Sequence, residues 1–233
     1  MNVIIKNIPN SITCMNLAAG CMAVISAFKG EASFWGLTGI EWCYIFIGVA
    51  AVMDFCDGMA ARLLGAYSDM GKELDSLCDA VSFGVAPAML VFNLMIDNEV
   101  PEWLPYFSLF IPVAGVLRLA KFNIDTRQTT SFIGLPIPAN AIFWIGFTAL
   151  AGSNASWLLN WYWFLPIVLV ESWLMISPIK LFSLKFKNLK WNGNEWRWVL
   201  ILTAVALVGI LGASGLMWLV VAYVIYGLLS KEG

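Results

Sequence analysis

Long apolar runs alternate with short polar segments along almost the whole chain, and this pattern predicts membrane-spanning helices. A helix needs about 20 mainly apolar residues to cross a bilayer. Eight runs meet or approach that length: residues 11–28, 36–60, 76–96, 103–121, 133–152, 157–179, 196–212 and 215–230. Only a Gly-Ala-Ser-Gly turn separates the last two, so we interpret them as a helical hairpin. The pattern predicts an all-α, polytopic transmembrane helical bundle with about eight spans.

Composition supports this class and excludes several kinds of chemistry. Of 233 residues, 61% are hydrophobic and only 12% are charged, whereas soluble domains average about 45–50% apolar and about 25% charged residues. The chain has no histidine, which excludes histidine general bases, histidine-ligated zinc and Ser–His triads. A net charge of −2 gives no reason to expect nucleic-acid binding. The five cysteines form no CxxC pair, and we expect no structural disulfide.

Basic residues are distributed unevenly over the predicted connections. With eight spans and the N-terminus inside, Lys29 alone among the 13 basic residues lies on the outer side. Positive charges concentrate in cytoplasmic loops, so we expect the side that carries the other twelve basic residues to face the cytoplasm. That inner side receives Lys6, Arg62, Lys72, Arg118, Lys121, Arg127, Lys180, Lys185, Lys187, Lys190, Arg197 and Lys231.

Four aspartates stand out between the second and third runs, on the predicted cytoplasmic side. Residues three or four apart share one face of a helix, so Asp54 and Asp57 project together from the end of the second run. Asp75 and Asp79 do the same at the start of the third. A turn between them lets the two pairs converge, as carboxylates do in the metal sites of helical bundles. Four hard oxygen ligands suit Mg²⁺ or Mn²⁺, and two such ions could clamp a diphosphate.

Small residues and one arginine frame these aspartates. Gly58 and Ala61 lack bulk and leave room for a ligand against the helix. Arg62 adds a fixed positive charge suited to phosphate. Taken alone, each acidic residue would be an ordinary surface carboxylate, and Arg62 an ordinary anchor on the positive side. The group, in phase with two helix faces, favours a site for metal and phosphate.

The aspartate segment resembles the complete signature of the CDP-alcohol phosphatidyltransferases, D-x2-D-G-x2-A-R-x8-G-x3-D-x3-D, with no position substituted. The resemblance implies a six-helix membrane core and a homodimer. It also implies transfer of a phosphatidyl group from a CDP-linked lipid to an alcohol, with release of CMP. We assign the core to residues 1–190 and the predicted additional hairpin to residues 191–233.

Carried over position by position, the resemblance implies roles for the signature residues. The metal ligands would be Asp54, Asp57, Asp75 and Asp79. Asp79 would also act as the general base toward the acceptor hydroxyl. The CDP moiety would contact Gly58, Ala61, Arg62, Gly71 and Asp75. The expected cofactor is Mg²⁺ or Mn²⁺, with two ions bound.

Segments outside the signature resemble the serine-using branch of this family. They read IPNSIT at 8–13, VSFGVAPAML at 81–90, RLAKFN at 118–123 and GLPIPAN at 134–140. The resemblance implies CDP-diacylglycerol as the donor and serine as the acceptor. We expect the protein to lie in a bacterial-type inner membrane, and the distribution of basic residues predicts that the active site faces the cytoplasm.

A serine acceptor brings a carboxylate that needs a cation. Arg118 lies at the inner end of the fourth run, and an arginine can bind a carboxylate through two parallel hydrogen bonds. We therefore expect Arg118 to bind the acceptor, with Asn123 as a nearby polar orienter; the alternative is a plain positive-side anchor. A second basic group is expected to contact anionic headgroups. It consists of Lys180, Lys185, Lys187 and Lys190.

Other functions remain open at this stage. The same family includes enzymes that use glycerol 3-phosphate or inositol, and an ether-linked donor would make the chain an archaetidylserine synthase. A metal-ion transporter with intramembrane carboxylates is a hypothesis from another class. It predicts polar residues along a whole pore, whereas apart from Glu41 near the outer end of the second run, Glu171 is the only other acid inside a predicted span.

Overall fold

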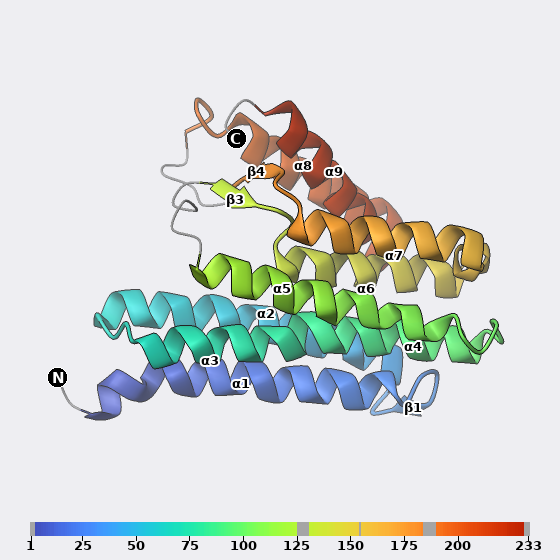
Figure 1. Ribbon diagram of the computed structural model, residues 1–233, viewed down its shortest axis with the longest axis horizontal. Coiled ribbons are helices and arrows are strands. Elements are labelled where there is room, and N and C mark those ends of the chain that lie inside the picture. The colour runs from blue at the N-terminus through green and yellow to red at the C-terminus, as the bar shows by residue number, and fades with distance from the viewer. Residues whose placement is uncertain (1–2, 125–130, 154, 184–189, 231–233) are drawn as a thin grey trace. The chain divides into compact units, whose positions relative to one another are not determined.

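The computed structural model describes residues 3–124, 131–153, 155–183 and 190–230, and most of them are helical (Figure 1). The chain divides into two compact units, Met1–Leu119 and Ala120–Gly233. Of the residues assigned to the inner side, Arg127, Lys185, Lys187 and Lys231 lie outside the described residues.

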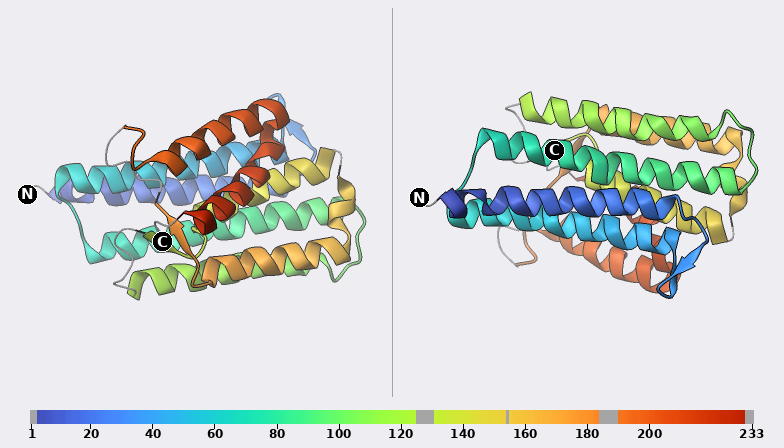
Figure 2. Two further views of the ribbon diagram at one scale, coloured as in Figure 1. Left: turned by 90° about the horizontal axis from the view of Figure 1, so that it is seen from above. Right: turned by 90° about the horizontal axis from the view of Figure 1, so that it is seen from below.

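Three long helical rods and part of a fourth build the first unit. α1, α2 and a rod made of α3, η1 and α4 run alongside one another (Figures 1 and 2). η1 is a π-helix inserted between α3 and α4. The elements are α1 (Val3–Ala27), β1 (Ser33–Phe34), β2 (Leu37–Thr38), α2 (Gly39–Leu64), α3 (Asp69–Asp79), η1 (Ala80–Val85), α4 (Ala86–Asp97), η2 (Pro105–Leu109) and α5 (Phe110–Ile124), which continues into the second unit.

The inward face of α1 is made of small and polar residues. Its large apolar side chains, among them Met15, Met22 and Ile25, are exposed. Such a helix suits a membrane protein, because small residues at helix interfaces let backbones approach closely while large apolar ones face lipid. The buried stripe follows a spacing of four and three residues: Pro9, Thr13, Asn16, Gly20, Ala23 and Ala27.

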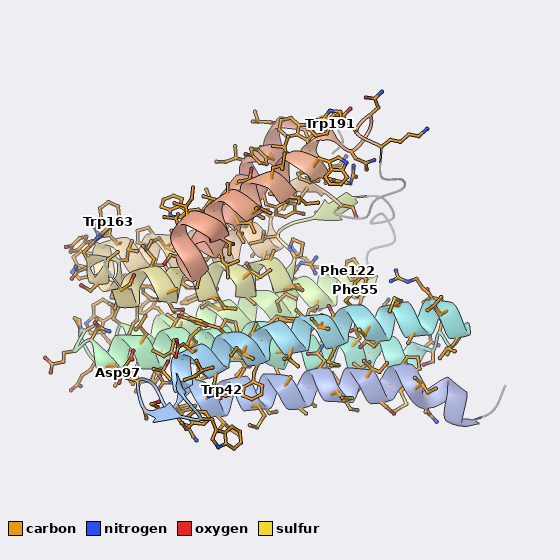
Figure 3. The ribbon with its side chains drawn as sticks, turned by 180° about the vertical axis from the view of Figure 1, so that it is seen from behind. Trp42, Phe55, Asp97, Phe122, Trp163 and Trp191 are labelled. Carbon is orange, nitrogen blue, oxygen red and sulfur yellow. The ribbon has the colours of Figure 1, made fainter. Side chains whose placement is uncertain are left out.

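The two ends of the first unit differ. One end carries Trp42 and Asp97, and Phe55 lies toward the other end of α2 (Figure 3). At the Trp42 end, β1 and β2 form a tight antiparallel pair before α2. α2 then begins with a capping box, in which Thr38 accepts a hydrogen bond from the Glu41 amide and Glu41 accepts from the Thr38 amide.

The second unit has an aromatic core. Phe143, Trp144 and Phe147 of α6 pack on one another, and Trp144 and Phe147 also pack on Phe164 of α7. Gly146 lets α6 approach the backbone of α9, since an added Cβ would lie 2.0 Å from the Met217 nitrogen. The elements are β3 (Ser131–Ile133), α6 (Ile137–Ser153), η3 (Ser156–Leu159), α7 (Trp161–Ile176), β4 (Lys180–Phe182), α8 (Glu195–Leu211), η4 (Gly212–Ser214) and α9 (Gly215–Leu229).

The predicted class of helical membrane protein is confirmed. Five described segments are long and apolar enough to cross a membrane, and two further apolar helices, Ile137–Ser153 and Trp161–Ile176, are shorter. The five are Asn7–Ala27, Gly39–Leu64, Asp69–Asp97, Pro105–Ile124 and Glu195–Leu229. α8 and α9 pack on each other, with the Thr203 and Tyr226 hydroxyl oxygens 3.2 Å apart. The count of eight spans and the division at residue 190 stay predictions.

Two features lie outside the all-α prediction. The second apolar run was expected to begin helical structure at residue 36, but Leu37 and Thr38 pair with β1 and the helix begins at Gly39. β3 and β4 form a second antiparallel pair, with Phe132 opposite Leu181, that joins the start of α6 to the end of α7. Both ribbons are short because they connect helices rather than build a sheet.

Candidate functional site

A tight reversal between α2 and α3 brings the two aspartate pairs together. Gly65 ends α2 in the left-handed conformation, with φ of 60°, and its amide hydrogen-bonds back to the last turn. Ser68 then starts α3 as its N-cap, because its side chain accepts a hydrogen bond from the Gly71 amide at 3.0 Å. The end of one helix and the start of the next therefore face the same space.

Three of the four signature aspartates converge. Asp54, Asp57 and Asp75 each offer a carboxylate oxygen, and these oxygens lie within 4.8 Å of one another. Asp75 Oδ1 is buried and has no hydrogen-bond partner among the described residues. Gathered carboxylates repel one another, and a buried oxygen without a donor is unfavourable. A divalent cation would relieve both costs, so these three residues fit a metal ion.

Asp79 is not one of the carboxylates that share this 4.8 Å spacing. Its side chain is only 7% exposed and accepts a hydrogen bond from Asn16 Nδ2 at 3.1 Å. It is one helical turn beyond Asp75, at the last residue of α3 and directly before the π-helix η1. The structure thus brings together three of the four expected metal ligands, and the roles of Asp79 as ligand and base stay predictions.

The π-helix is held closely against α1. At Gly20 an added Cβ would lie 2.3 Å from Ser82 Oγ, and Ser82 Oγ donates to the Asn16 carbonyl at 3.1 Å. Insertions of this kind inside α-helices often occur at functional sites. Here the insertion follows Asp79 and lies in the segment whose sequence resembled the serine-using branch.

A cavity of about 540 Å³ is lined by two of the three aspartates, Asp57 and Asp75. It lies between the beginning of α1, the end of α2 and the beginning of α3, and four of the five predicted CDP contacts line it. Arg62 is exposed and is not among the lining residues. The lining residues are Pro9, Asn10, Thr13, Asp57, Gly58, Ala61, Ala66, Tyr67, Ser68, Asp69, Gly71, Lys72 and Asp75.

Packing among the described residues does not explain why position 58 is a glycine. A Cβ built there would meet no atom of the described residues within 4 Å beyond its own stretch of helix, and Gly58 lines the cavity. Gly71 differs, because its Cβ would lie 3.0 Å from Asn10 Oδ1 and from Ser68 Oγ. The open space at Gly58 favours close approach of a ligand as the reason for its small size.

Sequence reasoning missed the contribution of α1. Thr13 Oγ1 donates to Asp57 Oδ2 at 2.6 Å, and Asn16 donates to Asp79. A signal was present, because these polar residues stand three positions apart in an apolar run and so share a helix face. The motif IPNSIT was noted only for its resemblance, although Pro9, Asn10 and Thr13 all line the cavity.

The predicted acceptor residues both lie on α5. Arg118 is 6% exposed, whereas Asn123 is half-buried. Five residues correspond to about 140° around a helix, so the two side chains start from different faces. Of the second basic group, Lys180 on β4 and Lys190 are exposed.

Known proteins resemble this chain over most of its length. The sequence profile of the CDP-alcohol phosphatidyltransferase family matches residues 6–176. A CDP-diacylglycerol–serine O-phosphatidyltransferase of Mycobacterium leprae is 38% identical over 181 residues, which cover 74% of this chain and 57% of that protein. The protein of the same name from Bacillus subtilis is 36% identical over 200 residues, or 82% of this chain and 98% of the relative.

A third relative extends the similarity. The Helicobacter pylori protein of that name is 30% identical over 229 residues, covering 95% of this chain and 89% of its own length. The part of each relative that aligns with this chain therefore differs: it is little more than half of the mycobacterial protein and nearly all of the Bacillus protein. Together with the intact signature, the profile match shows that the chain belongs to the CDP-alcohol phosphatidyltransferase family.

Proposed function

We propose that this chain is a CDP-diacylglycerol–serine O-phosphatidyltransferase. It transfers a phosphatidyl group from CDP-diacylglycerol to the serine hydroxyl, giving phosphatidylserine and CMP. The observation that carries the proposal is the convergence of Asp54, Asp57 and Asp75, two of which, Asp57 and Asp75, line a cavity together with other residues of the family signature. The acceptor is supported by relatives that bear this name and by the motifs of the serine-using branch.

The proposed cofactor is Mg²⁺ or Mn²⁺, with two ions bound. Asp54, Asp57 and Asp75 would hold metal, and Asp79 is the predicted fourth ligand. When bound, divalent metal neutralises the diphosphate and stabilises the charge of the leaving CMP. Oxygen-only ligands favour these hard cations over softer transition metals.

The cavity binds the CDP part of the donor. Gly58 and Ala61 provide a smooth helix surface, and Gly71 lines the opposite side. Arg62, which is exposed at the end of α2, binds phosphate from outside the cavity wall. The diacyl chains stay in lipid, because the helices that carry the site are apolar along most of their length.

Asp79 acts as the general base. The serine hydroxyl oxygen attacks the phosphorus that bears diacylglycerol, its proton passes to Asp79, and the bond from that phosphorus to the CMP oxygen breaks. Aspartate is a weak base, so alignment of the reactants supplies most of the rate. Full activity of Asp79→Asn with unchanged metal binding would rule out this role.

Arg118 binds the serine carboxylate through its two parallel N–H groups, and Asn123 orients the acceptor. Glycerol 3-phosphate or inositol is the alternative acceptor, and an ether-linked donor is the alternative lipid. Transport of metal ions is less well supported, because the clustered carboxylates belong to a transferase signature.

The site faces the cytoplasm of a bacterial-type inner membrane, where CDP-linked precursors and serine are available. The basic residues on that side support the orientation. We further propose a homodimer, with residues 191–233 forming an additional membrane hairpin that contributes lipid or dimer contacts.

One experiment tests the proposal. Purified protein in detergent receives CDP-diacylglycerol and Mn²⁺, with serine, glycerol 3-phosphate and inositol offered separately, and CMP release is measured. We expect release with serine and none after EDTA treatment. Release with glycerol 3-phosphate but not serine would change the acceptor only. No release with any acceptor would contradict the proposed class of reaction.

A further inference from the structure

We propose that α1 is a positioning helix for the active site, acting through Thr13 on Asp57 and through Asn16 on Asp79. Neither residue belongs to the family signature, and both lie on the buried stripe of α1. The inference rests on the proposed function for what the aspartates do. It adds how their orientation is set.

Thr13 fixes one oxygen of Asp57. The side chain of Thr13 is 3% exposed, and Oγ1 lies 2.6 Å from Asp57 Oδ2. That distance is typical of a hydroxyl that donates to a charged carboxylate. The competing acceptor, the Pro9 carbonyl of the same helix, lies farther away at 3.0 Å. Because a hydroxyl has one proton, the contact with Asp57 orients Oδ2 and leaves Oδ1 for a ligand.

Asn16 acts in the same way on Asp79. It is fully buried, its Nδ2 donates to Asp79 Oδ1 at 3.1 Å, and its own Oδ1 has no partner among the described residues. The reversed amide would place Asn16 Oδ1 against the carboxylate, so the donor orientation is the favourable one. The amide therefore holds Asp79 at a defined position in spite of its burial.

The backbone holds both donors in register. Thr13 and Asn16 share a face of α1, and Gly20, four residues further on, lies in close contact with Ser82. Any rotation of α1 would break that contact and the bond from Ser82 Oγ to the Asn16 carbonyl. One rigid helix thus delivers two donors to carboxylates from α2 and α3.

Removal of the Thr13 hydroxyl tests the first contact. Thr13→Val keeps the shape of the side chain, whereas Thr13→Ser keeps the hydroxyl. The matched control is Thr148→Val, at a buried threonine of α6 whose hydroxyl donates to its own helix at 2.9 Å. Mn²⁺ affinity is measured in detergent, without substrate, from the electron paramagnetic resonance signal of free Mn²⁺.

We expect Thr13→Val to bind Mn²⁺ about 10–100-fold more weakly, as is usual when the partner of a metal-binding carboxylate is lost. Thr13→Ser and Thr148→Val should stay within about threefold of the unmodified chain. Equal affinities for all four proteins would overturn the inference. Equal weakening in Thr13→Ser and Thr13→Val would also overturn it, because packing rather than the hydroxyl would be responsible.

Asn16→Leu tests the second contact through kinetics. We expect kcat for CMP release to fall about 10–100-fold, as for loss of a group that aligns a base, with KM for CDP-diacylglycerol within about threefold. An unchanged kcat, or a change confined to KM, would overturn the role of Asn16. If the unmodified chain releases no CMP at all, the proposed function fails, while the Mn²⁺ comparison still decides the role of Thr13.

Discussion

The buried polar side chains of α1 in the first unit and of α6 in the second form different kinds of hydrogen bond. In the first unit, polar groups of α1 reach across to other helices, as Thr13 does to Asp57 and Asn16 to Asp79. In the second unit, the polar side chains of α6 bond within their own helix: Thr148 donates to the Trp144 carbonyl, and Trp144 Nε1 donates to Asn140.

This difference assigns the proposed metal and substrate binding mainly to the first unit and the aromatic core to the second. In the first unit a cavity lies beside Asp75, whose buried Oδ1 has no donor among the described residues and is gathered with two further carboxylates, which is unfavourable for folding and useful for binding a cation. The buried Glu171 of the second unit also has an oxygen without a described partner, but it belongs to no such cluster among the described residues. The second unit fills the space around α6 with aromatic rings. We expect substitutions in the first unit to affect catalysis more than stability, and substitutions in the aromatic core to do the opposite.

The largest effect is expected at the converging carboxylates. Asp57→Asn and Asp75→Asn should each lower CMP release by about 10²–10³-fold or more, since each removes charge from the site that stabilises the diphosphate. The thermal unfolding temperature of the metal-free protein should stay equal or rise, because removing one of the gathered negative charges reduces the repulsion among them. CMP release and thermal unfolding in detergent measure the two effects.

The contrast between the two units would be contradicted if either amide variant unfolded at a much lower temperature without metal, because the carboxylates would then stabilise the fold. A matched control is Asp97→Asn, which changes an exposed aspartate at the opposite end of the unit, where it should affect neither quantity.

Trp144→Ala should give the reverse result in the second unit. Trp144 is fully buried and packs on Phe143, Phe147 and Phe164. Its loss should cost about 3–5 kcal/mol of unfolding free energy, as for aromatic residues in cores. At a temperature where the variant is folded, kcat should stay within about threefold. Denaturant unfolding and CMP release test both, and a large fall in kcat would break the contrast.

The sequence could predict the signature aspartates because their chemistry is local. Asp54 and Asp57 share one helical face by spacing alone, and the reversal at Gly65 is encoded beside them. The same local rules predicted the apolar helices, since about 20 apolar residues in a row have few other structures available. The family resemblance, carried by these residues, is confirmed by the profile match.

The rest depends on contacts between distant segments. Thr13 and Asp57 are 44 positions apart, and Asn16 and Asp79 are 63 apart, so neither pairing is visible in a local pattern. The β3–β4 ribbon pairs residues on either side of α6 and α7. The π-helix has no periodic signature of its own, and its residue Ser82 lies against α1 at Gly20. These features belong to packing, which hydrophobicity alone does not determine.

One close helix contact in each unit allows the same substitution, Gly→Ala, to be compared between the units, with a smaller expected effect. Gly20→Ala would place a Cβ 2.3 Å from Ser82 Oγ, and Gly146→Ala would place one 2.0 Å from the Met217 nitrogen. Each should cost about 1–3 kcal/mol through overpacking. Gly20→Ala should also lower kcat about tenfold, because displacing α1 weakens the Asn16 contact, whereas Gly146→Ala should leave kcat unchanged.

The control for this pair is Gly48→Ala on α2, where an added Cβ would meet no atom of the part of the chain that the structure describes within 4 Å, its own stretch of helix aside. It should raise the unfolding free energy by about 0.5–1 kcal/mol, the helix preference of alanine over glycine. If Gly20→Ala and Gly146→Ala changed kcat equally, close packing as such, and not the position of α1, would control the rate.

The smallest expected effect concerns Glu171, the buried acid of α7. Its Oε2 has no partner among the described residues, which is unfavourable in an apolar helix. Glu171→Gln keeps the shape and removes the ionisable group, so we expect a rise in stability of about 1 kcal/mol, or about 2–4 °C in unfolding temperature. CMP release should not change. A folded variant with strongly reduced release would mean that the second unit also carries a functional acid, and the division between a catalytic and a packing unit would no longer hold.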